Sequence, residues 1–102
     1  MKFVVSSTEL LTRLQSVSRV ISSKNSLPIL DNFLFILKDG HLTITASDLE
    51  TTLKAKMSID NITDEGEITV PAKLLVDSLR EFADQPLEFK TNETNSIIEI
   101  IW

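Results

Sequence analysis

Residues 3–17, with the sequence FVVSSTELLTRLQSV, change from strand periodicity to helix periodicity within a few positions. The alternation of apolar and polar side chains over Lys2 to Ser6 predicts a short strand. Ser6 followed by Glu9 has the spacing of a capping box, which predicts that a helix begins there. Apolar residues then return every three or four positions and predict a helix with one buried face: Leu10, Leu11, Leu14, Val17 and Ile21.

The same pattern occurs again in residues 68–82, ITVPAKLLVDSLREF, at an offset of 65 positions. Pro71 suits the first turn of a helix, and this second helix is expected over roughly Ala72 to Ala83. Six apolar positions coincide: Phe3 with Ile68, Val5 with Val70, Leu10 with Leu75, Leu11 with Val76, Leu14 with Leu79, and Val17 with Phe82. Any two amphipathic helices preceded by strands could align this well, so duplication and coincidence both stay open.

The residues between and after the helices predict antiparallel strands. Asn32 to Lys38 and His41 to Ser47 are joined by Asp39-Gly40, a dipeptide typical of two-residue hairpins. Further strands are expected over 50–58, 67–70, 86–91 and 96–102, with an acidic loop over 60–67. We therefore expect an α+β fold of order β-α-β-β-β-β-α-β-β, in which both helices pack on one face of a mainly antiparallel sheet.

Composition excludes several classes of site. The 102 residues suffice for one domain, and they contain no cysteine, one histidine and two glycines. This composition argues against thiolate or three-histidine metal sites and phosphate-binding glycine loops, so we expect no metal, no cofactor and no enzyme activity. The N-terminal apolar stretch is too short for a secretion signal, and we expect a cytoplasmic location. Asp48 and Glu50 could suggest paired catalytic carboxylates, but a turn-forming role is favoured over a small hydrolase.

The net charge of −5 is unevenly distributed along the chain. Residues 1–30 carry +3 and residues 31–102 carry −8, and no acidic residue occurs between Leu10 and Leu30. If both helices lie on one sheet face, their outer sides would form a surface that carries Arg13, Arg19, Lys24, Lys73 and Arg80, against Asp77 and Glu81. Such a surface would attract a phosphate backbone without reading sequence, and without stacking aromatics it suits a duplex. An ordinary solvated face with a Lys73–Asp77 pair is the alternative.

Three short motifs, in order and behind Met1-Lys2-Phe3, carry a resemblance to a known family. They are Leu27-Pro28-Ile29-Leu30, Ser47-Asp48-Leu49-Glu50 and Val70-Pro71-Ala72-Lys73. Together they resemble the amino-terminal domain of bacterial DNA polymerase III β subunits, the sliding clamps. The resemblance implies a head-to-tail homodimeric ring with three such domains per subunit, helices lining the hole and sheets outside. It further implies a DNA replication processivity factor that encircles duplex DNA and tethers the replicative polymerase.

The resemblance also implies roles for individual residues. Lys24, Lys73 and Arg80 match DNA-contacting positions, and Leu74 and Ser78 match the helix side that meets the neighbouring subunit. Residues 1–102 would then be the first clamp domain without its last edge strand. The second and third domains, which receive polymerase and clamp-loader peptides, would be absent. A free-standing protein-interaction domain without a DNA role is the alternative function.

Overall fold

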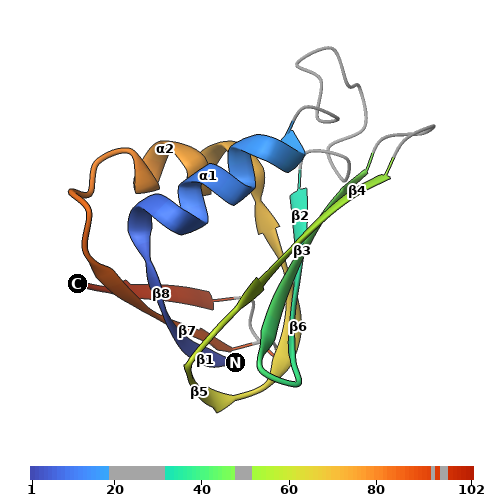
Figure 1. Cartoon of the computed structure of the whole chain (residues 1–102), viewed down its shortest axis with the longest axis vertical. Helices are drawn as coiled ribbons and strands as arrows, with labels where there is room; N and C mark the ends of the chain where they lie inside the picture. The colour runs from blue at the N-terminus through green and yellow to red at the C-terminus, as the bar shows by residue number, and fades with distance from the viewer. Residues whose placement is uncertain (19–31, 48–51, 93, 95–96) are drawn as a thin grey trace.

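Two helices lie side by side over two four-stranded antiparallel sheets in the computed structural model (Figure 1). The structure describes residues 1–18, 32–47, 52–92, 94 and 97–102. In chain order the elements are β1 (Lys2–Ser6), α1 (Ser7–Val17), β2 (Asn32–Lys38), β3 (His41–Ser47), β4 (Thr52–Ser58), β5 (Asn61–Asp64), β6 (Gly66–Pro71), α2 (Ala72–Leu79), β7 (Pro86–Asn92) and β8 (Ile97–Ile101). The α+β class is confirmed.

The first helix forms as its sequence pattern predicts. Ser6 is the N-cap residue, and its hydroxyl accepts a hydrogen bond from the Glu9 N–H at 3.4 Å. The stripe Leu10, Leu14 and Val17 is buried. Because α1 contacts β1 as well as β3 and β4, this stripe packs against strands of both sheets.

The second helix ends earlier than expected. α2 stops at Leu79, whereas the sequence pattern predicts helix to about Ala83. Beyond Arg80 the chain continues in tighter turns, in which the Glu81 and Phe82 N–H groups donate to carbonyls three residues earlier, both at 3.2 Å. This turn places the Phe82 ring against Trp102, with ring centroids 5.1 Å apart.

The predicted hairpin is confirmed. Asp39 and Gly40 have φ angles of 53° and 77°, so both turn residues are left-handed, as a two-residue turn between twisted strands requires. The register pairs Lys38 with His41 directly across this turn. The hairpin therefore aligns the buried residues of β2 and β3 on one face.

The single-sheet expectation is wrong, because the strands divide between two sheets of order β5-β1-β7-β8 and β4-β3-β2-β6. β1, which precedes α1, pairs with β7, which follows α2. Conversely, β6 precedes α2 and pairs with β2, which follows α1. The strand before α1 therefore lies in the sheet that contains the strands after α2. The strand before α2 lies in the sheet that contains the strands after α1. This exchange joins the two units into one core, in which Phe3 stacks on Phe89 with ring centroids 5.2 Å apart.

One strand was not predicted. β5 lies within the predicted acidic loop, so five strands rather than four separate the helices. Three of its four residues pair antiparallel with the free side of β1, where Phe3 is opposite Ile62, and Ile62 packs against the core. Local sequence is a poor guide to such a strand because its stability comes from a distant partner.

Candidate nucleic-acid interface on the helical layer

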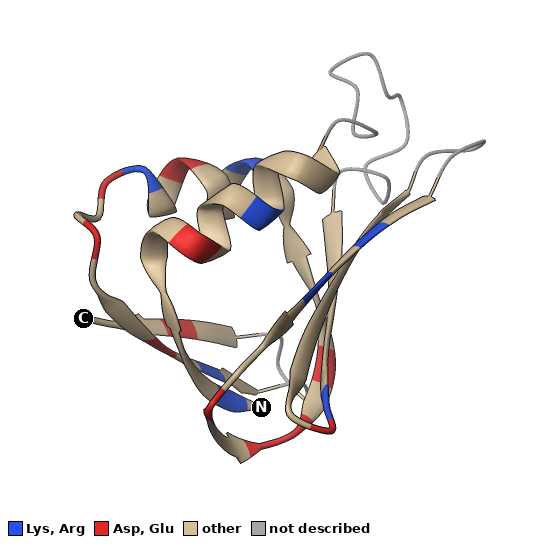
Figure 2. Cartoon of the chain, in the orientation of Figure 1, with Lys and Arg blue, Asp and Glu red and all other residues tan. Residues whose placement is uncertain are grey.

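The outward sides of α1 and α2 form one continuous layer, because the two helices lie in contact with each other. Their buried stripes face the sheets, and Leu11 and Val76 also pack against the core, so the exposed side chains lie on the opposite sides of the helices. Both signs of charge lie on this layer (Figure 2). Among the predicted cations that the structure describes, Arg13 is exposed on α1, and Lys73 and Arg80 are exposed on α2 and at its C-terminal end.

On α2, Lys73, Asp77 and Arg80 lie in one row, as their spacing predicts. The Lys73 ammonium lies 3.3 Å from Oδ2 of Asp77, the pair that was expected for the alternative of an ordinary solvated face. An Arg80 guanidinium nitrogen lies 3.8 Å from Oδ1 of the same carboxylate, a second pair that we did not predict. Asp77 therefore stands between two of the candidate DNA-binding cations.

On α1, Arg13 is exposed and has no ion pair with any residue that the structure describes. The hydroxyl of Thr12 donates to the Thr8 carbonyl at 2.9 Å, and that of Ser16 donates to the Thr12 carbonyl at 3.1 Å. These neighbours use their hydroxyl protons within the helix. Arg13 is thus the charged group that this stretch of α1 offers to an anion.

The described part of the helical layer is electrically balanced. Three cations, Arg13, Lys73 and Arg80, are matched in number by three acids: Glu9, Asp77 and Glu81. Arg19 and Lys24 lie outside the described residues, and so does Ile21 of the predicted first helix. The positive excess predicted for this surface therefore depends on Arg19 and Lys24.

The two predicted interface residues differ in exposure. Leu74 is 67% exposed, which is high for a large apolar side chain. Ser78 is partly buried, and its hydroxyl donates to the Leu74 carbonyl at 2.7 Å. Leu74 thus presents apolar surface next to the charged row of α2.

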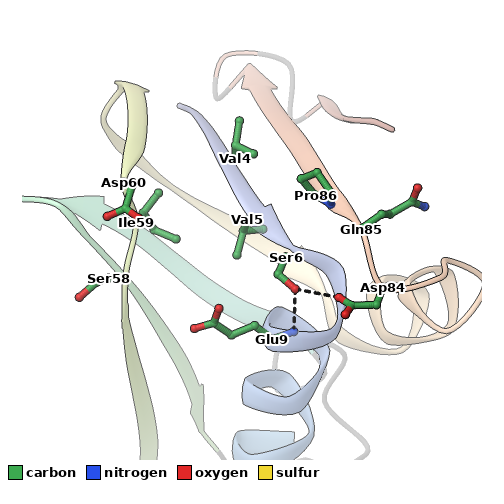
Figure 3. Close-up of a pocket in the computed structure, with 10 residues that line it drawn as sticks. All are labelled: Val4, Val5, Ser6, Glu9, Ser58, Ile59, Asp60, Asp84, Gln85 and Pro86. Atoms are coloured by element: carbon green, nitrogen blue, oxygen red, sulfur yellow. Dashed lines mark hydrogen bonds between the residues drawn. The ribbon is translucent and has the colours of Figure 1, made fainter.

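A pocket of about 460 Å³ opens where β1 meets α1, the β4–β5 connection and the segment before β7 (Figure 3). Its lining includes three carboxylates, from Glu9, Asp60 and Asp84, and contains no lysine or arginine. Asp84 accepts hydrogen bonds from the hydroxyls of Ser6 and Thr8, at 3.3 and 2.8 Å. Because phosphate would be repelled there, this pocket is not part of the candidate interface.

The features that suggested chemistry do not assemble into a catalytic site in the described structure. Asp48 and Glu50 lie outside the described residues. His41 is a partly exposed strand residue whose Nδ1 lies 2.9 Å from the Asp39 carbonyl oxygen, beside the hairpin turn. The described residues contain no cluster of His, Cys, Asp or Glu that could hold a metal ion.

In this same part of the chain, no helix is both long and apolar enough to cross a membrane.

Comparison with known proteins identifies consistent similarities. The family model of the DNA polymerase III beta subunit, N-terminal domain, matches residues 1–101. The chain is 37% identical over 84 residues to the beta sliding clamp of Haemophilus influenzae, covering 82% of this chain and 23% of that protein. It is 36% identical over 87 residues to the beta sliding clamp of Vibrio harveyi, covering 85% of this chain and 60% of that sequence.

Solved structures agree with these sequence matches. The crystal structure of DNA polymerase III subunit beta from Pseudomonas aeruginosa superposes with a TM-score of 0.87 at 30% identity, covering 98% of this chain and 27% of that one. Caulobacter crescentus pol III beta gives a TM-score of 0.88 at 26% identity, and the match covers 99% of this chain and 27% of that one. The chain thus spans about a quarter of the length of these solved relatives.

Proposed function

The chain belongs to the DNA polymerase III beta subunit family, whose N-terminal domain it matches, and from this we propose that it forms one domain of a sliding clamp. Such a clamp would be a ring that encircles duplex DNA and tethers the replicative polymerase as a processivity factor. The clamp would hold the polymerase on DNA and would not be an enzyme. It would act in the cytoplasm during DNA replication. The observation that carries the proposal is the side-by-side placement of α1 and α2, with Arg13 and the Lys73–Arg80 row on their outward layer.

Duplex DNA would meet this layer through phosphate contacts from Arg13, Lys73 and Arg80, and from Arg19 and Lys24. Contacts to phosphate carry no sequence information, so one such surface serves every position along the duplex. A ring holds DNA by topology, and its individual contacts can therefore be weak. The near balance of charge on the described layer supports weak contacts. Tight binding to individual phosphates would slow sliding along the duplex.

The subunit contact would use α2. Leu74 is exposed beside the charged row, and apolar surface of this kind suits burial against a second copy. We propose that Leu74 and Ser78 face the neighbouring subunit of a head-to-tail homodimer.

Residues 1–102 would be the first of three clamp domains, with the peptide-binding sites for polymerase and clamp loader in the other two. A further edge strand is expected beside β8. In the second sheet β4 pairs with the outer side of β3, and if the two strand-helix units are equivalent, β8 corresponds to β3. β8 stands at the end of the order β5-β1-β7-β8, and an edge strand of this kind can pair with a further strand.

The test is a chimera in which these 102 residues replace the matching residues of the Pseudomonas aeruginosa beta subunit, which keeps the rest of its own first domain and its other domains. After loading on nicked circular plasmid, the chimera should remain bound, and linearising the plasmid should release it. Equal retention on both DNA forms would contradict the clamp proposal. The unmodified Pseudomonas protein serves as the positive control.

A free-standing protein-interaction domain is the second candidate, favoured by the exposed apolar side chains Leu74, Ile97 and Trp102. This candidate differs from the clamp proposal in the chimera test. A chimera with such a domain would not remain bound to nicked circular plasmid after loading.

A further inference from the structure

Two cations on α2 share one carboxylate. Lys73 contacts Oδ2 of Asp77 at 3.3 Å, and Arg80 faces Oδ1 at 3.8 Å. The spacings i,i+4 and i,i+3 place all three side chains on the same side of the helix. Each oxygen of Asp77 therefore serves a different cation.

The three side chains are well exposed, at 91% for Lys73, 51% for Asp77 and 58% for Arg80. Ion pairs this exposed are weak, so a phosphate oxygen can take the place of the carboxylate. While the two pairs are formed, Asp77 holds both side chains along one side of the helix and reduces the charge of the row to +1. It also repels an approaching phosphate.

The helix dipole disfavours an acidic residue at this position. Asp77 lies in the last turn of α2, where the partial negative charge of the helix C-terminus disfavours an anion. The last turn of α2 contains no basic residue, and the basic group at this end of the helix is Arg80, the C-cap residue, which faces Asp77 itself. The favourable interactions of the Asp77 carboxylate are thus its ion pairs with Lys73 and Arg80, and both of these cations are candidate phosphate ligands.

We propose that Asp77 is a positioning residue that aligns Lys73 and Arg80 in a row and limits their affinity for DNA phosphate. This inference rests on the proposed function and adds a mechanism to it. When a phosphate leaves, the carboxylate recaptures each cation, so the contact is short-lived. Weak, rapidly exchanging contact is what movement along a duplex requires.

The experiment measures binding of the 102-residue chain to a short fluorescein-labelled duplex by fluorescence anisotropy over a range of salt concentrations. Asp77→Asn should bind about 3- to 10-fold more tightly than the unmodified chain at roughly 50 mM salt, because both cations are freed. Its affinity should also fall more steeply with salt, since more phosphate charge is neutralised. Asp77→Glu, which keeps the carboxylate, should bind like the unmodified chain.

Glu99→Gln is the matched control, because it changes the net charge equally from β8, away from the helices. If Asp77→Asn binds no more tightly than Glu99→Gln while Lys73→Ala and Arg80→Ala weaken binding, the inference is wrong and the proposed function stands. If the duplex binds neither the unmodified chain nor Asp77→Asn, DNA contact by this surface fails, and the inference fails with it. Thermal unfolding should show all variants folded, with Asp77→Asn at least as stable as the unmodified chain.

Discussion

Ser7 and Gln85 are joined by two hydrogen bonds, although 78 positions separate them. The Ser7 N–H donates to the Gln85 carbonyl at 2.9 Å, and the Gln85 N–H donates to the Ser7 hydroxyl oxygen at 3.1 Å. The same hydroxyl donates to the Ala83 carbonyl at 2.7 Å. Ser7 is 1% exposed, and the two hydrogen bonds of its hydroxyl group are partly buried. They attach the first turn of α1 to the segment that leads from α2 into β7, and thereby set how the two helices lie together.

Replacing Ser7 by alanine should lower the free energy of unfolding by about 1–3 kcal/mol, because the Gln85 N–H and the Ala83 carbonyl lose a buried partner. Urea denaturation measures this change. Ser16→Ala is the control, since the exposed Ser16 hydroxyl bonds only to a carbonyl within its own helix. Equal losses for the two variants would show that the long-range attachment contributes nothing.

The hairpin at Asp39-Gly40 gives a second stability prediction. Gly40 has a φ of +77°, and a methyl group on its Cα would meet no atom of a non-adjacent residue within 4 Å, so Gly40→Ala brings backbone strain without a clash. We expect a loss of about 1 kcal/mol in the free energy of unfolding. Asp39→Gly relieves a strained φ of 53° and should change stability far less. If both substitutions cost the same, positive φ is not what limits this turn.

Local patterns predicted those elements whose stability is largely local. The helical stripes around Leu10 and Leu75 and the Asp39-Gly40 turn could be recognised because neighbouring residues determine them. β5 could not, since Ile62 becomes part of a strand only through pairing with Phe3. The division into two sheets has the same cause, because it depends on pairings between distant strands such as β1 with β7.

Within the candidate site, the α2 row followed from helical spacing, and so did the Lys73–Asp77 pair. The Arg80–Asp77 pair is an addition to that prediction, and its i,i+3 spacing is present in the sequence. Exposed Leu74 agrees with an interface role but leaves that role a prediction. Arg19 and Lys24 lie beyond the described residues, so their place on the layer rests on the sequence pattern.

The location of the DNA contact can be tested with one cation on the helical layer and one on a sheet. Arg13 lies on α1, whereas Lys2 lies on β1 and pairs with Glu88 at 3.5 Å. Arg13→Ala should weaken duplex binding and reduce the salt slope by up to about 0.9, the value for one phosphate contact. Lys2→Ala changes the net charge equally and should leave the duplex affinity and the salt slope nearly unchanged. Equal effects in anisotropy titrations would mean that net charge, and not the helical layer, governs binding.

The subunit contact can be tested in the chimera with Leu74→Asp. Because the Leu74 side chain is 67% exposed, the substitution should leave the domain folded while placing an unpaired charge in the proposed interface. The dimer dissociation constant should rise at least about tenfold, which corresponds to roughly 1.4 kcal/mol, as measured by analytical ultracentrifugation. Thr69→Asp adds the same charge at an exposed position of β6 and should leave dimerisation unchanged. An unaltered dissociation constant for Leu74→Asp would place the subunit contact elsewhere on the domain.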